Sequence, residues 1–167
     1  MKLDIYYVDA FSHETFEGNP AAVIFSNLND DNLMQNIAAE NNLSETAFVN
    51  VTENENIIRW FSPTKEVDLC GHATLASAFV YFNYINTGKE TIEFKSNGGI
   101  LIVNKKDNLL ELDFPKDTFT QINSRDVIGD AVGLKPIETY KGQINLMAVY
   151  ENEEDILNLK PDFNKII

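Results

Sequence analysis

The segment that most constrains the fold is an apolar helix expected at residues 73–84. Its sequence ATLASAFVYF, from Ala73 to Phe82, is interrupted only by the small polar residues Thr74 and Ser77. A helix that is apolar on every face must be enclosed on all sides. At about ten strongly apolar residues, the stretch is far too short to span a membrane. We therefore expect a central core helix and no membrane association.

Short strands precede and follow this helix. They are rich in β-branched and aromatic residues and are separated by turn-forming residues; we expect them at residues 3–8, 21–25, 46–51, 57–61, 91–95, 100–103 and 109–114. A second, amphipathic helix is expected at residues 29–42, with Asp30 and Asp31 at its start. The simplest arrangement is an α+β fold in which a curved sheet wraps around the apolar helix.

The pattern changes after Pro115. We expect a helix at residues 125–132, capped by Ser124 and ended by Gly133, then a strand at 144–150 and a helix at 151–159. A single strand cannot easily bury both of its faces. Residues 1–116 are therefore predicted to form a first lobe, and residues 117–167 a linker with the incomplete start of a second.

Composition excludes several partners. The formal charge is −13, from 13 basic and 26 acidic residues, and a surface this acidic repels phosphate backbones, so no nucleic-acid partner is expected. A single cysteine, Cys70, cannot form an internal disulfide, and two distant histidines, His13 and His72, predict no metal site. The first residues lack a signal peptide pattern, which predicts a cytoplasmic protein.

Glu45 is a candidate acid/base. It lies where the helix at 29–42 gives way to an apolar strand, with Leu43, Ala47 and Phe48 nearby. Its carboxylate either faces water or sits in a low-dielectric pocket that would raise its pKa toward the range of a general acid/base. Most glutamates at strand starts face water, so spacing alone favours the first alternative.

The start of the apolar helix is a candidate anion site. The loop at residues 68–70 leads directly into the helix, so the N–H groups of Gly71, His72, Ala73 and Thr74 need partners. A bound carboxylate or phosphate would satisfy them. Alternatively, Asp68 or Thr74 caps the helix and the loop is structural.

Few other groups could hold an anion here. Residues 1–84 contain three basic and twelve acidic residues, so only the amides, His72 and Arg59 are available, which favours a small enclosed ligand. Cys70 is either a buried small hydrophobe, as free cysteines usually are, or a thiolate acid/base at the helix start.

Five stretches together resemble one family. They are VDAF at 8–11, FEGNPAAV at 16–23, LSETAF at 43–48, RWFSP at 59–63 and LCGHATLA at 69–76. In this order and spacing they resemble the PhzF-like family, the phenazine-biosynthesis-type isomerases that share the diaminopimelate epimerase fold. Residues 146–163 also resemble the beginning of the second domain of that family.

The resemblance implies two pseudo-symmetric lobes, each a curved, mostly antiparallel sheet around a central helix, with the active site between them. It implies proton transfer on a small carboxylate-bearing substrate without a cofactor, in a homodimeric protein. Glu45 matches the acid/base carboxylate, and Gly71 and His72 match a pair that lines the substrate site, with Ala73 and Thr74 next to it. No role is carried over for Cys70.

One feature of the family has no counterpart. Nothing in residues 115–167 resembles the motif of the second lobe that supplies an acidic partner and another helix N-terminus. The alternative prediction is therefore a catalytically inactive fragment that acts as a binding or self-association module.

Overall fold

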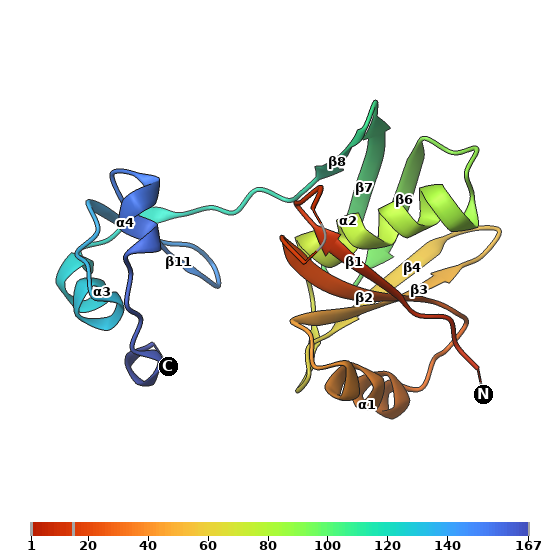
Figure 1. The fold of residues 1–167 in the computed structure, drawn as a ribbon, viewed down its shortest axis with the longest axis horizontal. Coiled ribbons are helices and arrows are strands. Elements are labelled where there is room, and N and C mark those ends of the chain that lie inside the picture. The colour runs from red at the N-terminus through yellow and green to blue at the C-terminus, as the bar shows by residue number, and fades with distance from the viewer. Residues whose placement is uncertain (1, 15, 167) are drawn as a thin grey trace. The chain divides into compact units, whose positions relative to one another are not determined.

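A computed structural model describes residues 2–14 and 16–166. The chain forms two compact units, Met1–Phe114 and Pro115–Ile167 (Figure 1). Among the described residues, none of the helices combines the length and the apolar character needed to cross a membrane.

The first unit is built on one sheet that is mostly antiparallel. Its strands follow the order β1-β2-β3-β4-β6-β7-β8, with β5 added beside β4. Only the β2–β3 and β4–β6 pairs are parallel. The strands are β1 (Tyr6–Ala10), β2 (Asn19–Phe25), β3 (Glu45–Val51), β4 (Asn56–Phe61), β5 (Glu66–Val67), β6 (Thr91–Ser96), β7 (Gly99–Lys106) and β8 (Leu109–Asp113).

The sheet curls around α2 (Gly71–Val80), which lies against its concave side (Figure 1). Both edge strands, β1 and β8, contact α2, as do β2 and β3. Because a flat sheet could not bring both edges to one helix, these contacts establish the curvature. The expected α+β lobe with a central apolar helix is confirmed.

Enclosure of α2 is less complete than predicted. Most of the helix is buried, because small side chains such as Ala73, Ala76 and Ala78 let the strands approach closely. Phe79, however, is 43% exposed, on the flank where β1 and β8 do not pair with each other. The helix then continues as one π-helical turn, η1 (Tyr81–Ile85), where the sequence predicted regular helix.

The other face of the sheet is covered by α1 (Asp31–Asn41). Asp30 caps this helix, since its side chain accepts a hydrogen bond from the Leu33 N–H at 3.1 Å. Met34 and Ala38 are buried, in a cluster with apolar residues of β2, β3 and β4. The amphipathic helix predicted at residues 29–42 is confirmed.

The second unit contains more strands than predicted. Its three-stranded sheet has the order β11-β10-β9, and the sequence predicted only the last of these strands. The two missed strands are short and polar, so they lack the usual pattern. The elements are β9 (Thr120–Gln121), α3 (Arg125–Val132), β10 (Glu138–Lys141), β11 (Leu146–Val149), α4 (Glu153–Leu157) and η2 (Phe163–Lys165).

The expected cap of α3 is wrong in one respect. Ser124 occupies the N-cap position, but its hydroxyl makes no capping bond. Its N–H instead donates to the hydroxyl of Thr139, a buried residue of β10. Gly133 ends the helix with a φ of +84°, as predicted.

Candidate functional site

Glu45 is held at the start of β3, in the middle of the sheet. Its backbone pairs in register with Ala21 of β2, and the next residue pairs with Phe61 of β4. The side chain of Glu45 is 22% exposed, and its Oε2 lies 3.5 Å from Nε2 of His72. The carboxylate is therefore largely withdrawn from water and faces the start of α2, rather than being fully solvated as spacing alone favoured.

The loop that leads into α2 is supported from the β6–β7 turn. A Cβ placed on Gly98 would lie only 2.6 Å from the Asp68 carbonyl oxygen, so the turn and the loop are in close backbone contact. This contact requires glycine at the turn. It holds the loop two residues before the N-cap of α2 against the turn.

The N-terminus of α2 has no side-chain cap. Cys70 occupies the N-cap position without a capping hydrogen bond. The Thr74 hydroxyl donates backwards to the Cys70 carbonyl oxygen. The alternative in which Asp68 or Thr74 caps the helix is wrong.

The first N–H groups of α2, at residues 71–74, bond to no oxygen outside the helix among the described residues, and those of His72 and Ala73 face the Cys70 sulfur. Ala73 and Thr74 are fully buried, so these donors lie inside the protein. The helix dipole adds to their preference for an anion.

Cys70 is a buried thiol. Burial is the main reason that its pKa rises from an ordinary 9.0 to about 12, and the nearby Glu45 carboxylate raises it further. The N–H groups of Ala73 and His72 lower the pKa, but by less. The thiol is protonated at neutral pH, as the buried-hydrophobe interpretation predicted.

This raised pKa predicts slow alkylation of Cys70. The reactive thiolate is rarer by about 10³-fold at neutral pH, since each pKa unit is tenfold. Iodoacetamide should therefore label the native protein about 10³ times more slowly than the urea-unfolded chain, followed by mass spectrometry. A native labelling rate that levels off near pH 9 would contradict the raised pKa.

His72 lies between the thiol and the carboxylate. Its side chain is 9% exposed, and Nδ1 lies 3.5 Å from the Cys70 sulfur. Among the described residues, Nε2 has no hydrogen-bond partner of good geometry, although Glu45 is close. Burial lowers the pKa of His72, while Glu45 and the Pro20 carbonyl oppose this effect. The imidazole is therefore neutral at pH 7.

Arg59 does not hold an anion at this site, contrary to one sequence-based expectation. Its Nε and Nη2 donate to the two carboxylate oxygens of Glu66, each at 2.7 Å. Its Nη1 donates to Asp31 at 2.7 Å. These two carboxylates raise the pKa of Arg59. Because the guanidinium is fully engaged, any anion at α2 depends on the helix amides.

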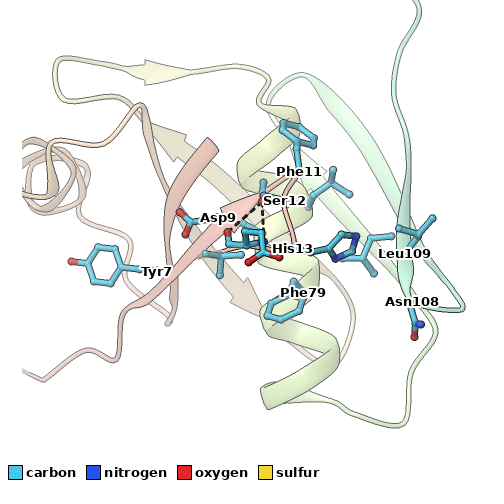
Figure 2. A pocket seen from close by; sticks show the side chains of 14 residues that line it. Tyr7, Asp9, Phe11, Ser12, His13, Phe79, Asn108 and Leu109 are labelled. Atoms are coloured by element: carbon cyan, nitrogen blue, oxygen red, sulfur yellow. Dashed lines mark hydrogen bonds between the residues drawn. The ribbon is translucent and has the colours of Figure 1, made fainter. Parts of the chain in front are cut away.

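A cavity of about 660 Å³ lies on another flank of the first unit. Figure 2 shows Phe11, Phe79 and Leu109 around it, together with His13 from the loop after β1. Neither Glu45 nor residues 70–74 line this cavity. Within the described residues, the cluster at α2 brings a carboxylate and a buried imidazole to a helix N-terminus, which this cavity does not.

Sequence reasoning missed one consequence of this geometry. One potential ligand atom each from Glu45, Cys70 and His72 lies within 4.8 Å of the others. The prediction of no metal site rested on the small number of histidines and on the distance between them in the sequence. It did not consider Glu45, which lies 25 positions before Cys70 in the sequence but close to it at the start of α2 in the structure.

The family model for phenazine biosynthesis-like proteins, PhzC-PhzF, matches residues 8–167. The chain belongs to this PhzF family. An uncharacterized isomerase of Pseudomonas aeruginosa is 46% identical over 165 residues, which are 98% of this chain and 63% of that protein. A human phenazine biosynthesis-like domain-containing protein is 36% identical and is matched over 64% of its length.

Solved structures support the same assignment of fold. A PhzF family protein of Enterococcus faecalis has a TM-score of 0.90 and 45% identity, covering 99% of this chain and 64% of that one. A predicted epimerase of Pseudomonas aeruginosa has a TM-score of 0.74 at 17% identity, covering 96% and 64%, and shows the fold alone. The resemblance and the epimerase-like lobe are confirmed. This PhzF chain spans somewhat less than two thirds of these relatives.

Proposed function

We propose that the chain contains the first lobe of a PhzF-type isomerase that moves a proton on a small carboxylate-bearing substrate without a cofactor. Glu45 acts as the acid/base. The observation that carries the proposal is the Glu45 carboxylate, 3.5 Å from His72, beside the uncapped N-terminus of a buried helix. Relatives that carry the name isomerase support the reaction class. The activity proposed is that of the whole PhzF protein.

The chemistry requires two groups that act on one substrate. The substrate carboxylate accepts hydrogen bonds from the amides at the start of α2, residues 71–74, which places a neighbouring C–H near Glu45. Glu45 removes the proton and returns it at another carbon. Conjugation within the substrate spreads the carbanion charge, and the fixed amide dipoles stabilise the part that reaches the carboxylate.

His72 lines this site with an uncharged side chain. Since its imidazole is uncharged at neutral pH, it contacts the carboxylate of Glu45 without forming a full ion pair. Since His72 carries no positive charge, the substrate carboxylate is bound by the backbone amides and forms no ion pair with this imidazole.

Gly71→Ala tests the anion site. An added Cβ would contact only the Phe114 ring, at 3.6 Å and 3.9 Å, so the variant should fold normally. The methyl group narrows the approach to the helix amides, and we expect benzoate to bind about tenfold more weakly, the equivalent of one hydrogen bond to a charged group. Amide NMR shifts of residues 71–74 during a benzoate titration measure this binding.

Benzamide is the matched control, since it has the same ring without the charge. It should leave these amides unshifted. If benzoate moves other residues and not 71–74, or binds Gly71→Ala as well as the original chain, the carboxylate site is wrongly placed.

The alternative of a self-association module rests on a separate observation. Several apolar side chains of the second unit are exposed, among them Ile144 at 92%, Leu157 at 76% and Phe163 at 76%. Exposed apolar patches favour association. A dimeric sedimentation coefficient that falls to the monomer value in Leu157→Ser would favour this alternative, and a monomer at high concentration would exclude it.

A further inference from the structure

Three side chains at the start of α2 are types that bind transition metals. Glu45 supplies a carboxylate oxygen, Cys70 a sulfur and His72 an imidazole nitrogen, and we call them the Glu-Cys-His cluster. One potential ligand atom from each lies within 4.8 Å of the others. Two of the contacts are 3.5 Å, between the Cys70 sulfur and Nδ1 and between Glu45 Oε2 and Nε2.

For either imidazole nitrogen, one of these separations matches that of neighbouring ligand atoms in a tetrahedral site. Zinc bonds of about 2.3 Å to sulfur and about 2.0–2.2 Å to nitrogen and oxygen place neighbouring ligand atoms roughly 3.3–3.7 Å apart. A cation binds only one imidazole nitrogen. The ligand atom that lies beside the other nitrogen must therefore move closer when the metal binds. Glu45 is the most exposed of the three side chains and can make this adjustment.

A second observation points independently to a ligand. The His72 side chain is 9% exposed, and within the described residues its Nε2 has no hydrogen-bond partner of good geometry. Buried polar nitrogens are rarely left in this state. This nitrogen is directed toward the Glu45 carboxylate, where a cation would bridge the two groups.

Charge determines which cation fits. A thiolate and a carboxylate together neutralise a divalent ion, so the occupied site adds no net charge to the interior. The thiol proton leaves when the metal binds. Sulfur and imidazole select zinc, cobalt and similar ions over magnesium or calcium, which prefer oxygen. The net charge of −13 favours cation approach.

We propose that the Glu-Cys-His cluster binds a borderline-soft divalent cation such as Zn²⁺ through three protein ligands, leaving a fourth position open. Bound metal occupies the carboxylate that we assign to proton transfer. It therefore holds the isomerase in a reversible inactive state. The inhibition rests on the proposed function, whereas metal binding does not.

Cobalt titration of the 167-residue chain tests the binding directly. Co²⁺ at this site should produce a thiolate-to-cobalt charge-transfer band together with the strong visible bands of tetrahedral cobalt. Stoichiometric Zn²⁺ should remove both, and excess Mg²⁺ should not. Absence of the thiolate band, or its loss on addition of Mg²⁺, would overturn the proposal.

Variants locate the ligands. Cys70→Ala should abolish the charge-transfer band. Glu45→Gln and His72→Gln should keep a thiolate contact but weaken cobalt binding by at least about 100-fold, since even outer-sphere partners cost 10–100-fold. His13→Gln is the control, because His13 lines the separate cavity and should bind cobalt as the original chain does.

The metal site can still be tested if one of these variants does not fold. Circular dichroism checks each fold, and Glu45→Gln changes a partly exposed group, so it remains informative if Cys70→Ala unfolds. Binding that survives both Glu45→Gln and His72→Gln, or that His13→Gln removes, would show an adventitious site and overturn the proposal. Zinc binding without inhibition of proton exchange would leave the site intact and contradict only the catalytic assignment.

Discussion

Glu45→Gln is expected to lower the rate of proton exchange at the substrate carbon by about 10²–10⁴-fold, the usual contribution of a general acid/base. The amide has nearly the shape of the carboxylate but cannot accept the proton. Since Glu45 is only partly buried and its backbone is held by β2 and β4, the fold should be unchanged.

The measurement uses small conjugated carboxylates incubated with the protein in deuterated water. Mass spectrometry of the recovered acids then counts deuterium bound to carbon. Glu40→Gln is the matched control, because Glu40 is exposed on α1 and should leave exchange unchanged. Full exchange in Glu45→Gln would remove Glu45 from the mechanism.

Benzoate binding separates the two parts of the proposal. Glu45→Gln should still bind benzoate at the helix amides, because the carboxylate contributes no hydrogen bond to the anion. If the original chain binds benzoate but exchanges no proton with any acid, these 167 residues dock the substrate without catalysing the reaction.

Gly18→Ala is expected to destabilise the first unit by about 3 kcal/mol or more. Gly18 has a φ of +83°, a conformation that is strained for any residue with a Cβ. An added Cβ would also lie 2.3 Å from the Ala10 carbonyl oxygen and 3.0 Å from Cβ of Ser12. Since the first of these atoms belongs to the backbone, the turn between β1 and β2 must move.

Urea unfolding measures this loss, which is a large part of the roughly 5–15 kcal/mol typical of a domain. Gly88→Ala is the matched control, because no atom lies within 4 Å of its added Cβ. Its effect should stay within about 0.5 kcal/mol. Equal unfolding midpoints for the two variants would show that the close contact at Gly18 does not hold in solution.

The central helix shows how far composition predicts structure. The run of small and apolar residues after Gly71 correctly predicted a helix enclosed by strands, because no other environment shields every face. It could not predict that Phe79 remains 43% exposed, since that depends on whether β1 and β8 pair across the helix.

The second unit shows the opposite case. The strands β9 and β10 consist of short, mostly polar segments, so local pattern does not distinguish them from loops. They form because backbone pairing with a neighbouring strand supplies their hydrogen bonds. β10 pairs with β11 across a short loop, whereas β9 pairs with β10 across the whole of α3, so β9 depends on a partner distant in sequence.

The amino-acid sequence by itself determined the lobe, its apolar helix and the membership of the PhzF family, because periodicity and ordered motifs are local properties. Only the tertiary structure decided that Arg59 is bound by Glu66 and Asp31 and that α2 has no side-chain cap. It also decided that Glu45 meets Cys70 and His72. The contacts of Arg59 with Asp31 and of Glu45 with residues 70 and 72 join segments distant in sequence, so their geometry exists only once the chain has folded.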